Sequence, residues 1–230
     1  MTASELECYL IELQSTNPLL LRLKELSRTY NIYICGGYLR NVLLNNCCNK
    51  DLDIFVDCGK EEFKCLVDTM SKWGDMQYGQ YGSPRLYCTD PKIDYIDIVP
   101  FYNFIVAGKP LLTIDEILRN FDFTLNAIAW SLRDGTLLDP LNGIADASNK
   151  KLRAVRLDFP EMMVSKDIQI SAVSVFWFRL LHYQNVLGLT FDPITESWII
   201  ENYCRIKDYD QFCKYFFKPS ISDSIIKKLR

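Results

Sequence analysis

Two aspartates one residue apart are the feature of the sequence best suited to chemistry. Asp51 and Asp53 flank Leu52 in the segment 51–57, which alternates in the manner of a β-strand. Side chains two residues apart on a strand point to the same face, so both carboxylates converge while Leu52 faces the core. Like charges this close repel unless a cation lies between them, and magnesium prefers oxygen ligands and leaves room for phosphates. A solvated strand end is the alternative interpretation.

A glycine pair upstream of these aspartates predicts a phosphate site. The expected strand 32–35 ends at Gly36 and Gly37, and a helix over 38–44 begins directly afterwards. Glycines let the backbone approach a ligand closely, and free amides at a helix start favour a phosphate. Arg40 adds a positive charge one turn into the helix. A tight turn followed by a surface arginine is the alternative, but it leaves the carboxylate pair on the next strand unexplained.

A third acid comes from a later apolar strand. In the segment 93–99, Ile96 and Ile98 share one face and Asp97 lies on the other. An acid within so apolar a strand is costly without a partner. We therefore expect Asp97 to be a third metal ligand from a neighbouring strand, whereas Asp94, nearer the turn, is expected to be solvated.

Composition limits the class of protein. The chain has 230 residues, of which 49% are apolar and 24% charged, as in an ordinary globular protein. Its net charge of −3 argues against binding nucleic acid with the whole surface, so any such site must be local. Nine cysteines without repeated Cys-x-x-Cys spacing, and an opening segment without a secretory signal, predict reduced thiols and a cytoplasmic location. No stretch approaches the roughly 20 apolar residues that span a membrane.

The elements expected around these residues form an α+β (α/β) fold. It consists of a small mixed β-sheet head with flanking helices, over residues 1–145, followed by a helical neck domain over 146–230. In the head we expect helices at 4–14, begun by a Ser4–Glu7 capping box, and at 18–28, capped by Asn17. Further elements are expected as strands over 51–57, 76–80, 85–89 and 93–99, a helix over 61–73, mostly helical structure after 114, and helices over 167–183, 193–205, 209–217 and 221–229.

These motifs resemble a known family. The text YICGGYLRNVLLNNCCNKDLDIFVD looks like the head motif of the class II CCA-adding tRNA nucleotidyltransferases and bacterial poly(A) polymerases, G-G-x-x-R-D/N-x-L-L followed by D-L/I-D. That family lies within the nucleotidyltransferase superfamily that includes DNA polymerase beta. The segment FDFTLNAIA resembles the family's R-R-D-F-T-x-N-A-L-A, and LLDPLNGIADASNKKLRAV is similar to its I-D-P-x-x-G-x-x-D-L-x-x-x-x-L-R-x-V. The resemblance covers roughly residues 30 to 156.

The resemblance implies roles for individual residues. Asp51 and Asp53 would bind the metals, with Asp97 as the third carboxylate. Gly36, Gly37 and Arg40 would hold the triphosphate, while Asp122 and Asn126 would lie near the ribose and the primer end. For Asp122, capping a helix over 123–130 is an alternative role.

The sequence also departs from the family. Asn120 and Phe121 stand where two arginines usually precede the aspartate, and Arg119 is shifted. The family's base-reading motif, E-D-x-x-R on a neck helix, is replaced by a segment containing Lys166 and Asp167, and then by an apolar helix that ends in Arg179 and His182. We expect Arg179 to replace the missing contact to the nucleotide, because it is the one charged residue in the C-terminal half of that helix. Asp167 lies about three turns away, too far to act with Arg179 on the same base edge, and His182 is expected to be a packing residue.

The implied function is nucleotidyl transfer. Two Mg²⁺ ions would move a nucleoside monophosphate from an NTP to a hydroxyl, most consistently an RNA 3′ end such as that of tRNA, and release pyrophosphate. The basic and aromatic segment 203–230 is a possible RNA contact, although its aromatic residues follow helical spacing, as core residues do. Alternatives are the same chemistry on a small-molecule or protein hydroxyl by a stand-alone head-and-neck enzyme, or a non-catalytic nucleotide-binding module. A protein partner could supply RNA binding.

Overall fold

The computed structural model describes residues 1–46, 51–79, 82–106, 108–158, 163–164, 168–222 and 225. The chain divides into two compact units. The first unit contains residues 1–121 and 125–148, and the second contains residues 122–124 and 149–230. Each unit is described by itself below.

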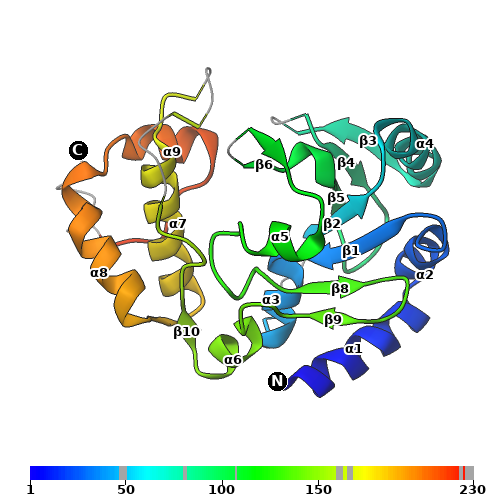
Figure 1. Cartoon of the computed structure of the whole chain (residues 1–230), viewed down its shortest axis with the longest axis horizontal. Coiled ribbons are helices and arrows are strands. Elements are labelled where there is room, and N and C mark those ends of the chain that lie inside the picture. Colours follow the sequence, from blue (N-terminus) through cyan, green and yellow to red (C-terminus); the bar gives the residue numbers. More distant parts are fainter. Residues whose placement is uncertain are drawn as a thin grey trace. The chain divides into compact units, whose positions relative to one another are not determined.

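A mixed sheet of seven strands organises the first unit, as the sequence predicts. Its strand order is β3-β4-β5-β2-β1-β8-β9, which Figure 1 shows from β3 and β4 to β8 and β9. Strands β2 and β5 run parallel, whereas the other neighbours are antiparallel. The strands are β1 (Asn31–Cys35), β2 (Asp51–Asp57), β3 (Asp75–Tyr78), β4 (Pro84–Tyr87), β5 (Tyr95–Pro100), β8 (Ala129–Ser131) and β9 (Leu137–Leu138). A separate hairpin pairs β6 (Ile105–Val106) with β7 (Lys109–Pro110).

Helices surround this sheet in the first unit. They are α1 (Ala3–Thr16), α2 (Pro18–Leu26), α3 (Gly37–Leu43), α4 (Lys60–Met70), α5 (Ile114–Leu118) and α6 (Gly143–Ser148). Asn17 caps α2 as predicted, because its side-chain oxygen accepts from the amides of Leu19 and Leu20 at 2.9 Å. The capping box of α1 was placed wrongly, since Thr2 and Glu5 form it, two residues earlier than expected.

The helix expected over 123–130 is absent. Residues 129–131 instead form β8, which pairs antiparallel with β1 and is buried along its length. A short, mainly apolar run such as 123–130 fits a buried strand as well as a buried helix, so periodicity could not separate the two. This segment forms a strand because it pairs with β1, and the local sequence does not specify that pairing.

The second unit is mainly helical. It contains α7 (Ala172–Val186), α8 (Pro193–Asn202) and α9 (Tyr209–Tyr215), with a short parallel pair of β10 (Lys151–Leu152) and β11 (Thr190–Phe191). Helix α7 begins five residues later than expected, because the side chain of Ser171 caps it by accepting from the amide of Ser174. Most of the helix expected over 221–229 lies outside the described residues. Among the described residues, no helix has the length and apolar character needed to cross a membrane.

Candidate active site

The three acids singled out in the sequence occupy one face of the first unit's sheet. Strand β2 buries Leu52, Ile54 and Val56 completely on its opposite face, which leaves Asp51 and Asp53 for this one. In the parallel pairing of β2 with β5, Asp53 stands directly opposite Asp97 and Asp51 opposite Tyr95. Residues opposite each other on neighbouring strands share a face, so the sheet register brings Asp97 to the carboxylate pair.

Asp53 lies at the turn that the glycines form. Gly36 has a φ of 74°, a conformation that side chains disfavour, and a Cβ atom there would stand 3.2 Å from Asp53 Oδ2. Burial, followed by the charges of Asp97 and Asp51, raises the pKa of Asp53 to about 7, against the lowering effect of Arg40 and Arg85. Asp53 therefore loses its proton less readily than an ordinary aspartate, and a cation beside it would favour the charged form.

Asp97 has a partner that the sequence analysis did not foresee. Arg85, opposite Asp97 on β4, donates from Nε to Oδ1 and from Nη2 to Oδ2, both at 2.7 Å. Its guanidinium carbon lies 4.0 Å from the centroid of the Tyr95 ring. Tyr95 stands opposite Asp51 in the strand register, and its pKa is raised, first by burial and then by Asp51. Arg85 lies outside every quoted motif, so only the strand register could have revealed it.

The donor set partly fits a magnesium ion. Asp51 and Asp53 offer hard carboxylate oxygens from one strand face, and magnesium binds to one or two carboxylates while substrate phosphates and water complete its shell. Within the described part of the chain, however, no three acid, histidine or cysteine side chains converge closely enough to hold a metal ion. Both oxygens of Asp97 accept from Arg85 in this structure. The aspartate pair fits the ion, and the third carboxylate is engaged elsewhere.

Two of the residues expected to bind nucleotide contact each other in the first unit. The side chain of Arg40, on α3, is only 7% exposed, and its Nη1 donates to Asn126 Oδ1 at 2.8 Å. Its Nε donates to Asn41 Oδ1 at 2.9 Å. Because Arg40 also lowers the pKa of Asp53, its charge acts at the carboxylate pair. The segment around Asn126 and the start of α3 thus belong to one site.

Phe121 packs in an aromatic cluster where the resembled family carries an arginine. Its ring lies 5.5 Å from that of Phe55, on the same face of β2 as Asp53, and 6.3 Å from that of Phe104. A Cβ atom at Gly36 would stand 3.9 Å from Phe121 Cε2, so the ring reaches the same turn as Asp53. An apolar side chain therefore borders the carboxylates at this position.

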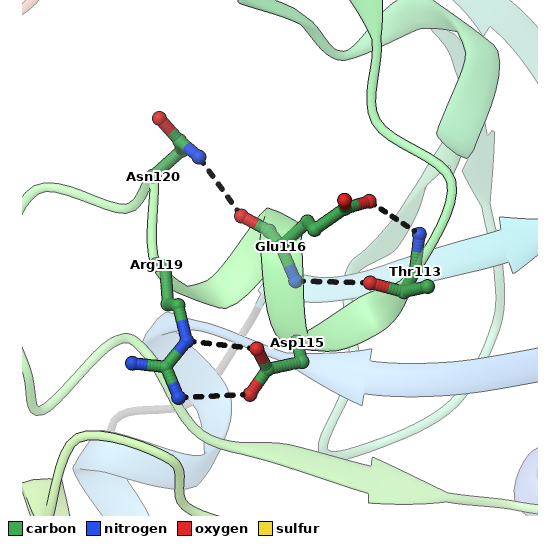
Figure 2. Close-up of polar contacts among 5 residues, drawn as sticks. All are labelled: Thr113, Asp115, Glu116, Arg119 and Asn120. Carbon is green, nitrogen blue, oxygen red and sulfur yellow. Dashed lines mark hydrogen bonds and ion pairs between the residues drawn. The ribbon is translucent and has the colours of Figure 1, made fainter.

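The shifted arginine, Arg119, is paired locally. Figure 2 shows its guanidinium against Asp115, with Nε 2.7 Å from Oδ2 and Nη2 3.2 Å from Oδ1. Thr113 and Glu116 cap the helix that carries both residues, and Asn120 donates to the carbonyl oxygen of Glu116. Both members of the Arg119–Asp115 pair are about half exposed, and the pair joins residues four apart at α5. In this structure Arg119 therefore pairs within its own segment.

In the second unit, Arg179 and Asp122 form an ion pair. Arg179 Nε lies 3.1 Å from Asp122 Oδ2, and a shorter bond joins Nη2 to the same oxygen. The guanidinium carbon also lies 5.4 Å from the ring centroid of Tyr183. Asp122 caps no helix, so that alternative was wrong, although its Oδ1 accepts from the amide of Phe123. The structure thus joins two residues that the sequence assigned separately to nucleotide binding.

Other residues named from the sequence take structural places or lie outside the description. His182 Nδ1 accepts from the amide of Ser220 at 3.0 Å, and its ring lies 4.5 Å from that of Phe217, as a packing residue does. Tyr209 and Phe212 are buried. Lys166 and Asp167 lie outside the described residues.

The fold and the carboxylate face together define a protein of the poly A polymerase head type. The model of that family, the poly A polymerase head domain, matches residues 32–153, more than half of the chain. The chain belongs to this family.

Relatives and solved structures agree with this assignment. The CCA-adding enzyme of Streptococcus pyogenes serotype M5 (strain Manfredo) is 30% identical over 219 residues, which are 90% of this chain and 50% of that relative. A CCA-adding enzyme in complex with CTP has a similar fold, with a TM-score of 0.66 at 19% identity over 99% of this chain and 54% of that one. The Thermotoga maritima CCA-adding enzyme complexed with tRNA(CCA) gives 0.64 at 19%, over 99% and 53%. The chain spans about half the length of the curated relatives it matches.

Proposed function

We propose that the protein is a magnesium-dependent, template-independent nucleotidyltransferase that moves a nucleoside monophosphate from an NTP to the 3′ hydroxyl of an RNA, tRNA in particular. The observation that carries the proposal is the sheet face that Asp51, Asp53 and Asp97 share, with Asp53 beside Gly36. Relatives named for CCA addition, and similar folds in complexes with CTP and with tRNA, support the choice of substrates.

Asp51 and Asp53 are the residues we assign to the metal, with Asp97 as the third carboxylate of the two-ion site. When bound, the ions supply charge that favours the deprotonated hydroxyl and neutralises the leaving pyrophosphate. Burial and the charges of Asp97 and Asp51 raise the pKa of Asp53, and a cation bound beside it would favour its charged form. The protein side of the reaction is therefore positioning and charge placement, and it needs no histidine base.

The nucleotide is proposed to bind along the start of α3. Gly36 leaves backbone without a side chain beside Asp53, and Gly37 does so beside the Arg40 guanidinium. Arg40 supplies a buried positive charge held in place by Asn126. A guanidinium binds phosphate oxygens in pairs, with a geometry that a lysine does not match. Asn126 thereby acts both as a support for Arg40 and as a candidate contact to the ribose.

Arg179 and Asp122 are proposed to act on the nucleotide or primer end as a pair, because each restrains the other. A small-molecule or protein hydroxyl remains a second candidate acceptor. The observation that favours it is the absence of arginine at Phe121 and the local pairing of Arg119, which leave fewer cations for an RNA backbone.

The test uses defined acceptors. Purified protein is incubated with magnesium, one labelled NTP at a time, and tRNA transcripts that end before, within or after the CCA sequence. The proposal expects labelled tRNA extended at its 3′ end, and no extension of a transcript whose 3′ hydroxyl has been oxidised. Transfer of label only to small molecules or to protein would replace the RNA acceptor with the second candidate.

A further inference from the structure

Arg85 is the residue of this site that the family motifs do not explain. It reaches Asp97 from the neighbouring antiparallel strand, and the two side chains form two parallel hydrogen bonds of 2.7 Å. The pair is largely withdrawn from water, with side-chain exposures of 31% for Arg85 and 23% for Asp97. Forked pairs of this kind are stronger and more directional than single contacts.

The guanidinium is fixed from a second side. Its central carbon lies 4.0 Å from the centroid of the Tyr95 ring, within the range of a strong cation–π contact. Tyr95 also stands directly opposite Asp51, one of the proposed metal ligands, in the pairing of β5 with β2. Arg85 is therefore held between Asp97 and the ring of Tyr95, in a position set by the register of β4, β5 and β2.

The Arg85 guanidinium thus places a positive charge on Asp97, the third carboxylate of the site. Both oxygens of Asp97 accept from Arg85. Among the described residues, no group of three acid, histidine or cysteine side chains is placed to hold a metal ion. A metal ion and the guanidinium would compete for the same carboxylate. Of the anions that the proposed reaction brings to this face, the triphosphate is the strongest competitor for a guanidinium.

We propose that Arg85 is a positioning residue that withholds Asp97 from the metal until a nucleoside triphosphate draws the guanidinium away. The inference rests on the proposed function. The ion would have two protein carboxylates as ligands before the NTP binds and three afterwards. Arg85 thereby couples assembly of the metal site to arrival of the substrate.

The experiment counts the water molecules left on bound Mn²⁺, by electron paramagnetic resonance in isotope-labelled water, because each protein ligand displaces water. It compares the wild type, Asp97→Asn, Arg85→Gln and the double variant, without nucleotide and with a non-hydrolysable NTP. Without nucleotide, the wild type and Asp97→Asn should carry the same number of waters, whereas Arg85→Gln should carry one fewer than the double variant. With the NTP, the wild type should carry one fewer than Asp97→Asn.

A second substitution separates geometry from charge. Arg85→Lys keeps the positive charge but cannot form the planar fork, so it should behave like Arg85→Gln. Thermal melts in chelator identify variants that fold, and Arg85→Lys serves as the test protein if Arg85→Gln melts early.

Three outcomes would overturn the inference. One is an extra water in Asp97→Asn compared with the wild type before nucleotide is added, because Asp97 would then bind the ion beside Arg85. Another is an equal count in Arg85→Gln and the double variant, which would show that Asp97 is not a ligand. The third is no difference between wild type and Asp97→Asn with the NTP present. Mn²⁺ binding that survives Asp53→Asn would instead contradict the metal assignment of the proposed function, and the inference with it.

Discussion

The carboxylate face and the segment 113–126 differ in how far they keep the family's pattern. On the carboxylate face, Gly36, Asp51 and Asp53 stand where the motif has them, and the sheet brings Asp97 opposite. In the segment 113–126, Phe121 stands in place of an arginine and packs on Phe55. Strand register therefore fixes the residues assigned to the reaction. At Phe121 an aromatic ring packed on Phe55 and Phe104 takes the place of a cation.

The largest expected effect comes from removing a carboxylate of the aspartate pair. Asp51→Asn or Asp53→Asn should lower nucleotidyl transfer by about a thousandfold or more, since a metal site supplies several kcal/mol of transition-state stabilisation. Pyrophosphate release at saturating NTP measures the loss. Asp57→Asn is the matched control, because Asp57 is an exposed acid at the far end of the same strand, and it should retain activity.

Residual activity above a few per cent in either variant would show that the reaction does not depend on the carboxylate face, so Asp51 and Asp53 could not be its metal-binding residues.

A second prediction concerns the buried arginine of α3. Arg40→Ala should weaken NTP binding by about tenfold to a hundredfold, in the range of one or two lost charge-assisted hydrogen bonds, and should weaken acceptor binding less. Isothermal titration with a non-hydrolysable NTP measures the first effect and a tRNA binding assay the second. Arg22→Ala, which removes an exposed arginine of α2, is the control. Equal losses for both ligands would give Arg40 a purely structural role.

A third prediction links the carboxylate face to pH. The folded-state pKa of Asp53 is raised from 3.8 to about 7, so this group favours folding fully below pH 4 and that contribution is lost as the pH rises through 7. In chelator, Asp53→Asn should therefore be more stable than the wild type. The difference in their free energies of unfolding should grow between pH 5 and pH 8 to a few kcal/mol. Melting temperatures across this range follow that growth.

The Asp57→Asn variant should show no such growth with pH. If the stability difference between Asp53→Asn and the wild type stayed constant across this pH range, ionisation of Asp53 would not destabilise the folded protein.

The smallest effect is expected from the ion pair of the second unit. Arg179→Ala should change the relative use of CTP and ATP by roughly threefold to tenfold, because single contacts discriminate between similar substrates by about 1 kcal/mol. Competition between the two labelled NTPs measures the ratio. Asp122→Asn should shift the ratio in the same direction if the pair acts as a unit. A lower melting temperature with an unchanged ratio would mean that Arg179 only packs on Asp122 and Tyr183.

The parts of the site that were predictable are those encoded by neighbours in sequence. The alternation of 51–57 gave the face of Asp51 and Asp53, and the strand, glycine and helix order gave the place of Arg40. Arg119 and Asp115 are four residues apart on one helix, a spacing that local reasoning could have paired.

The parts that were not predictable depend on pairing between distant strands. Arg85 meets Asp97 only because β4 and β5 are in one particular register, and nothing within either strand specifies that register. The same limit explains the wrong helix prediction at β8, because that buried segment becomes a strand through its pairing with β1.

The central claim is that this face transfers nucleotides to an RNA end, and one measurement tests it most directly. The protein is incubated with magnesium, each labelled NTP and total RNA, beside Asp53→Asn and Asp57→Asn, and the label is followed into RNA, protein and small-molecule fractions. The account predicts label at the 3′ ends of RNA with the wild type and Asp57→Asn, and none with Asp53→Asn. Unlabelled RNA with every NTP, or equal labelling by Asp53→Asn, would contradict it.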